Sequence, residues 1–187
     1  MRAIHKIYCV SGRTASGKST ITRMVAEKLG LKVVKSYATR PMRKGEEVES
    51  DHIFIKPEDI DKYRDDIVAY TKIGDYEYFC TKEQLMSCDL YVIDPKGVYD
   101  LLLHTKDMDV EVETIYITVP KSVLLDRAKS RGDDIKVFNA RFDAENKQFS
   151  DYERSDTIHY RILNDGNIED SVEKMIRIIS KDREMNK

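Results

Sequence analysis

The segment Gly12–Ser19, GRTASGKS, constrains the fold of this chain more than any other feature. It fits the pattern G-x-x-x-x-G-K-[ST] without a mismatch. Before it, AIHKIYCV is short, apolar and rich in β-branched and aromatic residues, which indicates a buried strand. After it, STITRMVAEKLG places apolar residues at helical spacing and ends at Gly30, a natural C-cap. The order of strand, glycine-rich loop and helix is the context that the pattern requires.

This loop has the chemistry of a phosphate-binding site. Gly12 and Gly17 permit backbone angles that a side chain would forbid, so the loop N–H groups can turn inward as an anion nest at a helix N-terminus. We expect Lys18 to reach the β- and γ-phosphates of ATP, and the Ser19 hydroxyl to ligate Mg²⁺. The predicted ATP-binding set in the loop is Gly12, Arg13, Thr14, Ala15, Ser16, Gly17, Lys18, Ser19 and Thr20.

The composition is that of an ordinary enzyme. A length of 187 residues suits one domain with a small insertion, and a net charge of −2 gives no basic field for nucleic acid. No apolar run approaches the ~20 residues that span a membrane, and the first residues lack a signal-peptide pattern. Cys9, Cys80 and Cys88 show no metal-ligand spacing and form an odd set, which favours the reducing cytoplasm.

Apolar strand segments recur along the chain with helical segments between them. The expected strands are 4–10, 31–36, 89–94, 113–118 and 158–163. This alternation predicts a three-layer α/β fold with a parallel core sheet. The core is expected to comprise residues 1–35, 88–128 and 151–187 of a single domain, 1–187.

Two segments break this alternation. Residues 36–87 combine a polar loop, a helix expected at 58–65 and a hairpin turn at Gly74-Asp75, which predicts a small antiparallel insertion that binds the phosphate acceptor. Residues 129–150 are polar and carry several arginines with few apolar anchors, which is typical of a mobile helical lid.

The insertion contains a second candidate phosphate site. In SYATRPMRKGEE, Arg40 and Arg43 flank Pro41, whose ring stiffens the backbone. Two guanidinium forks held in this way can clamp a phosphate in bidentate fashion, and the Tyr78 hydroxyl can donate to the same anion. Two clusters of phosphate-binding character imply a donor and an acceptor.

Taken in order, these motifs resemble the guanylate kinase family over nearly the whole chain. The residues that carry the resemblance are the Gly12–Ser19 loop, the block Ser36-x-x-x-Arg40-x-x-Arg43-x-Gly45-Glu46, DHIF, Tyr78, Thr81, VIDPKGV, Arg127, Arg131, Arg141 and ILND. The resemblance implies that the acceptor is bound by Ser36, Arg40, Arg43, His52, Tyr78 and Thr81. It implies catalytic roles for Lys18, Arg40, Asp94, Arg127, Arg131 and Arg141, with Asp94 ordering metal-bound water or Arg40. It also implies that Asn164 lies beside the adenine of ATP.

The chain departs from the family at the positions whose side chains recognise guanine. Val68 or Ala69, and also Val92, stand where the family has carboxylates. His52 stands where the family has a tyrosine after the glycine-glutamate turn. Loss of a carboxylate that pairs with guanine would remove much of the discrimination for that base. Either other residues such as Ser36 and Glu77 read guanine, or the acceptor is another molecule.

The sequence therefore predicts an ATP-dependent kinase that transfers the γ-phosphate to a nucleoside monophosphate, GMP or a related acceptor, with Mg²⁺ as cofactor. The expected partners are ATP and a small phosphorylated acceptor, without nucleic acid or membrane, in a monomer or homodimer. One alternative is a kinase like ribose 1,5-bisphosphate phosphokinase, which has a histidine at the position of His52. Another is a non-catalytic guanylate kinase-like interaction module, against which the intact Lys18 argues. The roles of Glu46, Glu47 and Glu77 stay open.

Overall fold

The computed structural model describes residues 4–42 and 50–185, and the chain divides into two compact units. Unit 1 comprises Met1–Cys9 and Lys32–Glu113, and unit 2 comprises Val10–Leu31 and Thr114–Lys187. The predicted roles of Arg43, Glu46 and Glu47 lie outside the described residues.

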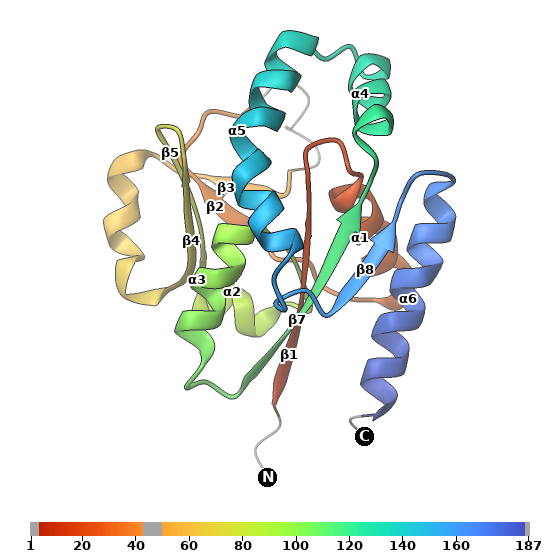
Figure 1. The fold of residues 1–187 in the computed structure, drawn as a ribbon. Helices are drawn as coiled ribbons and strands as arrows, with labels where there is room; N and C mark the ends of the chain where they lie inside the picture. The colour runs from red at the N-terminus through yellow and green to blue at the C-terminus, as the bar shows by residue number, and fades with distance from the viewer. Residues whose placement is uncertain (1–3, 43–49, 186–187) are drawn as a thin grey trace. The chain divides into compact units, whose positions relative to one another are not determined.

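A four-stranded core sheet has the strand order β6-β1-β7-β8, in which β7 and β8 lie side by side (Figure 1). Its strands are β1 (His5–Gly12), β6 (Leu90–Val92), β7 (Val110–Thr118) and β8 (Tyr160–Leu163). β7 and β8 pair in parallel from Ile115 opposite Tyr160 to Thr118 opposite Leu163. Residues 7–10 of β1 and 115–117 of β7 are buried, as expected for strands covered on both faces, whereas Leu163 of β8 is exposed. The expected α/β fold with a parallel core sheet is confirmed. The expected strand at 31–36 is reduced to a single bridge between Val33 and Leu90.

The helices follow local signals in the sequence. Unit 2 holds α1 (Lys18–Leu29), α4 (Lys121–Ser130), α5 (Ile135–Glu153) and α6 (Ile168–Met185), and unit 1 holds α2 (Lys82–Ser87) and α3 (Pro95–Thr105). α1 ends at Gly30, whose φ of 65° is the left-handed conformation expected of a C-cap. α3 begins after Asp94, whose carboxylate accepts hydrogen bonds from the N–H groups of Lys96 and Gly97.

Unit 1 contains a second sheet with the order β3-β2-β5-β4. Its strands are β2 (Ser36–Ala38), β3 (His52–Phe54), β4 (Ile67–Ile73) and β5 (Tyr76–Thr81). The hairpin between β4 and β5 turns at Gly74, as predicted, whereas β2 and β3 pair in parallel, so the insertion is not wholly antiparallel. The helix expected at 58–65 is instead two short 3₁₀ segments, Pro57–Lys62 and Arg64–Asp66. The four aspartates among these residues favour local hydrogen bonds over a regular helix.

The segment predicted as a lid has more apolar anchors than expected. Leu124 and Ala128 of α4 form a buried cluster with Phe138 and Phe142 of α5. Phe149 and Tyr152, further along α5, are buried as well. Polar residues separate these anchors in the sequence, but helical spacing gathers them on one face of α5. The expectation of few apolar anchors over 129–150 is therefore wrong.

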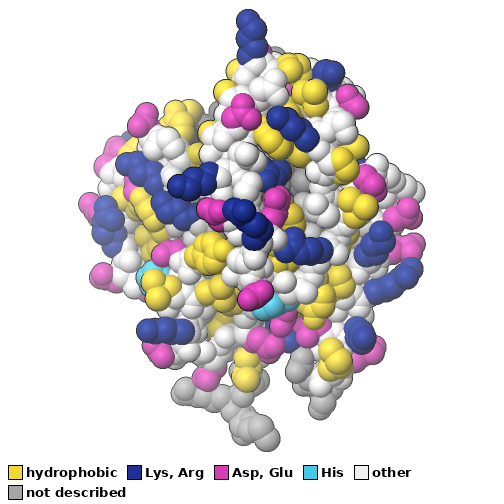
Figure 2. All heavy atoms as spheres, viewed as in Figure 1, with side chains coloured by type: hydrophobic (Ala, Val, Ile, Leu, Met, Phe, Trp, Pro, Cys, Tyr) yellow, Lys and Arg dark blue, Asp and Glu magenta, His cyan; other side chains and the backbone are white. Residues whose placement is uncertain are grey.

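Charged side chains of both signs are interspersed over the face of the molecule in Figure 2, in line with the net charge of −2. No helix within residues 4–42 or 50–185 has the length and apolar character needed to span a membrane.

Leu124→Ala tests the importance of the α4–α5 cluster. Leu124 is 1% exposed, so truncation should lower the free energy of unfolding by about 2–5 kcal/mol through lost burial and a cavity. Val137→Ala is the control, because Val137 lies on the same helix pair and is 61% exposed. Urea denaturation followed by circular dichroism would measure both variants. Equal, small losses would show that the cluster contributes little to the stability of unit 2.

Candidate functional site

The glycine-rich loop lies in unit 2 between β1 and α1. Glycine is required at two of its positions, both because neighbouring atoms lie too close for a side chain and because of the backbone angles. A Cβ atom on Gly12 would stand 2.7 Å from Ser16 Oγ, and a Cβ atom on Gly17 would stand 2.8 Å from Asn164 Nδ2. Gly17 also has a φ of 84°, in the left-handed region. A larger residue at either position would push the loop away from its neighbours.

Side chains from the C-terminal half of unit 2 brace this loop. The Ser16 carbonyl accepts hydrogen bonds from Asn164 Nδ2 at 2.8 Å and from Arg127 Nη1 at 3.5 Å. Asn164 is 1% exposed, and its Oδ1 accepts from the Ser171 hydroxyl at 3.2 Å. Arg127 Nη2 also donates to the Asn164 carbonyl at 2.9 Å. The roles implied for Asn164 beside adenine and for Arg127 at the transferring phosphate remain predictions, because both side chains here hold the backbone of the loop.

The interior of the loop suits an anion. Lys18 Nζ donates to the Arg13 carbonyl at 3.5 Å, and the Ser16 N–H donates to the same carbonyl at 3.1 Å. Ser16 Oγ is buried and has no hydrogen-bond partner among the described residues. A buried hydroxyl without a partner is costly unless a ligand supplies one. Ser19 is half-buried in the first turn of α1, and Thr20 beside it is exposed.

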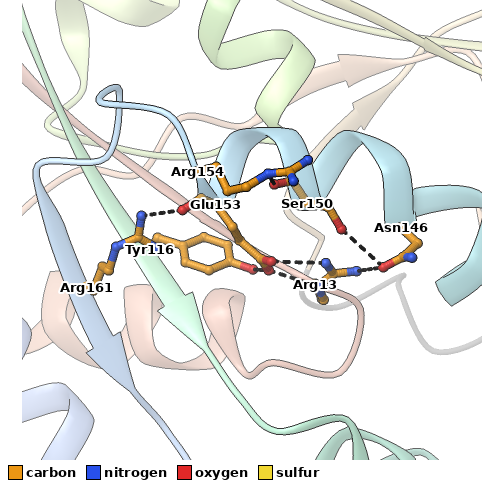
Figure 3. Close-up of polar contacts among 7 residues, drawn as sticks. All are labelled: Arg13, Tyr116, Asn146, Ser150, Glu153, Arg154 and Arg161. Carbon is orange, nitrogen blue, oxygen red and sulfur yellow. Dashed lines mark hydrogen bonds and ion pairs between the residues drawn. The ribbon is translucent and has the colours of Figure 1, made fainter.

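The side chain of Arg13 points away from the loop and into α5 (Figure 3). Its Nε and Nη2 atoms donate to the two carboxylate oxygens of Glu153 at 3.0 and 3.3 Å, and its Nη1 donates to Asn146 Oδ1 at 3.2 Å. The guanidinium lies over the rings of Phe142 and Phe149, 5.0 and 5.2 Å from their centroids. We call this set of contacts the Arg13 fork. Arg13 therefore ties the loop to the lid helix, a role that the sequence pattern did not indicate.

The Glu153 carboxylate is the electrostatic partner of the Arg13 fork. It also accepts a hydrogen bond from the hydroxyl of Tyr116, on β7. Burial of the carboxyl raises its pKa, but the hydrogen bonds from Arg13 and Tyr116 outweigh burial, and the pKa lies below the ordinary value. Glu153 is therefore ionised at neutral pH, and the bonds of the fork are charge-assisted.

Glu145, also on α5, is a residue at the loop that sequence reasoning missed. Its Oε2 atom is buried without a hydrogen-bond partner among the described residues. Burial raises the pKa of Glu145, against the opposing effects of Lys18, the Thr14 N–H, Arg141 and Arg13. Its place on α5, far from the loop in the sequence, gave no local signal of this proximity.

The other predicted lid arginines have different surroundings. Arg131, at the C-terminal end of α4, is exposed and pairs with Asp133. Arg141 is exposed on α5 and acts electrostatically on Glu145. Of the three, Arg127 contacts the loop directly, while the catalytic roles of Arg131 and Arg141 remain predictions.

In unit 1, three of the six predicted acceptor-binding side chains, Ser36, His52 and Tyr78, share one face of the second sheet. Strand alternation and register place Ser36, His52, Thr71 and Tyr78 on this face, which we call the Ser36 face. Ser36 Oγ and His52 Nδ1 are hydrogen-bonded at 2.9 Å, and the rings of His52 and Tyr78 lie 5.5 Å apart. The sequence thus identified residues that the fold brings together.

Arg40 lies at the Ser36 face through its contact with Phe54. Its guanidinium is 5.0 Å from the centroid of the Phe54 ring, it donates to the Pro41 carbonyl at 3.0 Å, and the residue is 6% exposed.

Two other predicted residues have structural partners. The Asp94 carboxylate caps α3, and the Thr81 hydroxyl caps α2 in a reciprocal pair with Gln84. Roles for Asp94 in catalysis and for Thr81 in acceptor binding remain predictions.

The carboxylate of Glu77 lies on the opposite face of this sheet. Glu77 alternates with Tyr78 along β5, and its Oε1 accepts a hydrogen bond from the Tyr70 hydroxyl at 2.6 Å. Burial and this bond raise the pKa of Tyr70 to about 12. Ala69, on the Ser36 face, is buried and carries no polar group. Among the described residues of the four strands, the Ser36 face therefore has hydroxyl and imidazole groups but no carboxylate.

Three comparisons relate the chain to known proteins. No protein-family model matches it. A guanylate kinase of Fusobacterium nucleatum subsp. nucleatum is 29% identical over 183 residues, covering 92% of this chain and 95% of that protein. The crystal structure of a guanylate kinase from Anaplasma phagocytophilum superposes with a TM-score of 0.70 at 20% identity, covering 96% of this chain and 87% of that one. An uncharacterized protein from Eubacterium ventriosum has a TM-score of 0.52 at 13% identity, covering 94% and 99%.

Glu153→Gln tests the Arg13 fork. The variant keeps the shape of the side chain but loses its charge, which should lower the free energy of unfolding at pH 7 by about 1–2 kcal/mol for a partly exposed charged hydrogen bond. A lowered pKa in the folded state means that the ionised form supplies the stability. The difference from wild type should therefore persist above about pH 5 and vanish as the pH falls through the lowered pKa.

Urea denaturation at a series of pH values would measure this difference. Glu173→Gln is the matched control, because Glu173 pairs with Arg177 on the exposed surface of α6 and should contribute little. A difference at Glu153 that grows at acidic pH would contradict the assignment of an ionised fork.

Proposed function

We propose that this chain, which resembles guanylate kinases in sequence and shares their fold, is an ATP-dependent kinase for a nucleoside monophosphate. The observation that carries the proposal is the phosphate loop with its lysine in a braced, glycine-dependent conformation. A scaffold module that only bound partners would have no need of this conformation. The mechanism requires little covalent chemistry, because positioning and charge stabilisation supply most of the rate in phosphoryl transfer.

On the donor side, the loop binds the phosphates of ATP and Lys18 stabilises the charge on the transferring group. The buried hydroxyl of Ser16, which has no hydrogen-bond partner among the described residues, can form a further hydrogen bond with a phosphate. Arg127 and Asn164 hold the Ser16 carbonyl and so fix the conformation of the loop. Preorganisation of this kind lowers the reorganisation needed when charge develops.

Mg²⁺ fits this arrangement as a ligand of the nucleotide. No group of three or more metal-ligating side chains occurs in the described part of the chain, so a dedicated protein cage is not the way in which it would be held. The Ser19 hydroxyl, next to Lys18 at the start of α1, is the side chain that would bind it, with phosphate oxygens and water as the other ligands. Bound there, the ion would neutralise charge on the β- and γ-phosphates.

On the acceptor side, Arg40, Tyr78 and His52 hold the phosphate of the nucleotide, and Ser36 orients the imidazole. Among the described strand residues, the Ser36 face offers a base hydroxyl and imidazole groups but no carboxylate. A guanine bound there would leave its N1–H and exocyclic N–H₂ groups without carboxylate acceptors, at about 1–3 kcal/mol for each missing partner. We therefore propose that the acceptor is a nucleoside monophosphate for which GMP is not strongly preferred.

An ADP-release assay tests the activity and the acceptor together. With MgATP and a panel of GMP, dGMP, AMP, CMP, UMP and ribose 1,5-bisphosphate, at least one nucleotide should release ADP, and GMP should not lead by more than about a hundredfold in kcat/KM. Lys18→Ala should reduce kcat by about 10²–10³ or more, because it removes charge stabilisation made in the transition state.

Each alternative predicts a different pattern in this assay. Turnover of ribose 1,5-bisphosphate alone would indicate the sugar-phosphate kinase, and no turnover of any acceptor would indicate the interaction module. Preference for GMP above a hundredfold would mean that another carboxylate reads guanine.

Arg40→Ala separates the acceptor site from the donor site. Removal of a guanidinium that binds the acceptor phosphate should raise the acceptor KM by about tenfold or more, for a charged hydrogen bond of about 1.5–3 kcal/mol. The KM for ATP should stay nearly unchanged. Arg64→Ala is the control, since Arg64 is an exposed arginine of the same unit that pairs with Asp61. A parallel rise in both KM values for Arg40→Ala alone would place this residue at the donor site.

A further inference from the structure

Arg13 forms hydrogen bonds through both its backbone and its side chain. Its backbone carbonyl accepts hydrogen bonds from the Ser16 N–H at 3.1 Å and from Lys18 Nζ at 3.5 Å. Its guanidinium donates to both carboxylate oxygens of Glu153, at 3.0 and 3.3 Å, and the Arg13 side chain is 11% exposed. The backbone of Arg13 thus holds the turn of the phosphate loop and its lysine, while the side chain fixes this part of the loop to α5.

A strained backbone conformation lies close to Arg13 in the loop. Ala15 has a φ of 61° and is the one non-glycine residue with a positive φ among residues 4–42 and 50–185. A Cβ atom makes this left-handed conformation costly, so it persists only where the surrounding structure enforces it. Ala15 packs against the α4–α5 cluster and lies between two fixed points. These are the Arg13 side chain and the Ser16 carbonyl, which accepts from Asn164 Nδ2 at 2.8 Å.

A buried tyrosine of the core sheet holds the partner of Arg13. The Tyr116 hydroxyl, on β7, donates to Oε1 of Glu153, the same oxygen that accepts from Arg13 Nε. Tyr116 is 1% exposed, and Arg161 Nη2 donates to the Glu153 backbone carbonyl at 2.7 Å. Figure 3 shows the Glu153 carboxylate between the Tyr116 hydroxyl and the Arg13 guanidinium. A continuous series of contacts therefore runs from the interior of the sheet through Glu153 and Arg13 to Lys18.

We infer that Glu153 and Tyr116 are positioning residues for the donor nucleotide, and that they act on the phosphate loop through Arg13. The inference rests on the proposed function in taking this loop as the donor site. If Arg13 is released from α5, the strain at Ala15 favours an ordinary backbone conformation, and the carbonyl that accepts from Lys18 shifts with it. A nucleotide must then reorder the loop at the moment of binding, which lowers its affinity.

Equilibrium binding of ADP without any acceptor tests the inference. Glu153→Gln should bind ADP about fivefold more weakly than wild type, and Tyr116→Phe about threefold or more, at the lower end of typical coupling between distant groups. Asp151→Asn is the matched control, because Asp151 pairs with Arg154 on the exposed side of the same helix. Its affinity should stay within about twofold of that of wild type. Titration calorimetry at pH 7 and fixed ionic strength would measure these proteins.

Arg13→Met separates positioning from a general loss of stability. Because Glu153 and Tyr116 act on the loop through Arg13, adding either substitution to Arg13→Met should change the affinity for ADP by less than about twofold. A general loss of stability would instead give additive effects. Full effects of Glu153→Gln and Tyr116→Phe in the Arg13→Met background would overturn the inference, and so would unchanged affinity in both single variants. Circular dichroism would confirm folding, and Tyr116→Phe, which removes one oxygen atom, is the mildest of the changes.

Hydrogen exchange in the nucleotide-free proteins gives a readout that does not need a ligand. The Ser16 amide, which donates to the Arg13 carbonyl, should exchange faster in Glu153→Gln and Tyr116→Phe than in wild type or Asp151→Asn. Equal exchange in all four proteins would contradict the inference. If wild type itself binds no ADP, the proposed function fails, and Ser16 exchange then decides by itself whether Glu153 and Tyr116 position the loop.

Discussion

The hydrogen bond from the Asn164 amide to the Ser16 carbonyl is the contact on which the phosphate loop depends. It joins a residue that follows β8 to the turn before α1, and Ser171 of α6 holds the other end of the same amide. Arg127 of α4 donates hydrogen bonds to the backbone carbonyls of Ser16 and Asn164. An ion pair between Lys28 and Glu169 also joins α1 to α6. The shape of an N-terminal loop is therefore determined by residues more than a hundred positions later.

Helix α5 adds a second set of constraints on the same loop. Its aromatic side chains Phe142 and Phe149 lie against Arg13, and its Glu153 pairs with that arginine. Apolar packing against α4 keeps the helix in place while polar residues meet the loop. The conformation of the loop and the packing of α5 against α4 thus depend on one helix, so neither can be altered freely without affecting the other.

Local patterns predicted much of the fold because local chemistry determines those elements. The loop motif, the Gly30 cap and the Gly74 turn each depend on residues close together in the sequence. Prediction failed where the outcome depended on distant partners. The aromatic anchors of α5 are dispersed among polar residues, and the engagement of Arg13 and Glu145 follows from packing that no local spacing reveals. Ser36, His52 and Tyr78 were identified through a resemblance, and strand register explains why they meet.

The hairpin of β4 and β5 has a consequence for the chemistry of acceptor binding. Tyr78 and Glu77 are neighbours on β5 and point to opposite faces of the sheet, so the pairing register alone decides which of them accompanies His52. A slip of one residue would exchange a phenol for a carboxylate beside the imidazole. The length of the turn at Gly74 and the irregularity between Ile67 and Ala69 hold that register. In evolutionary terms, one insertion or deletion in this hairpin could place a carboxylate beside His52 without any substitution.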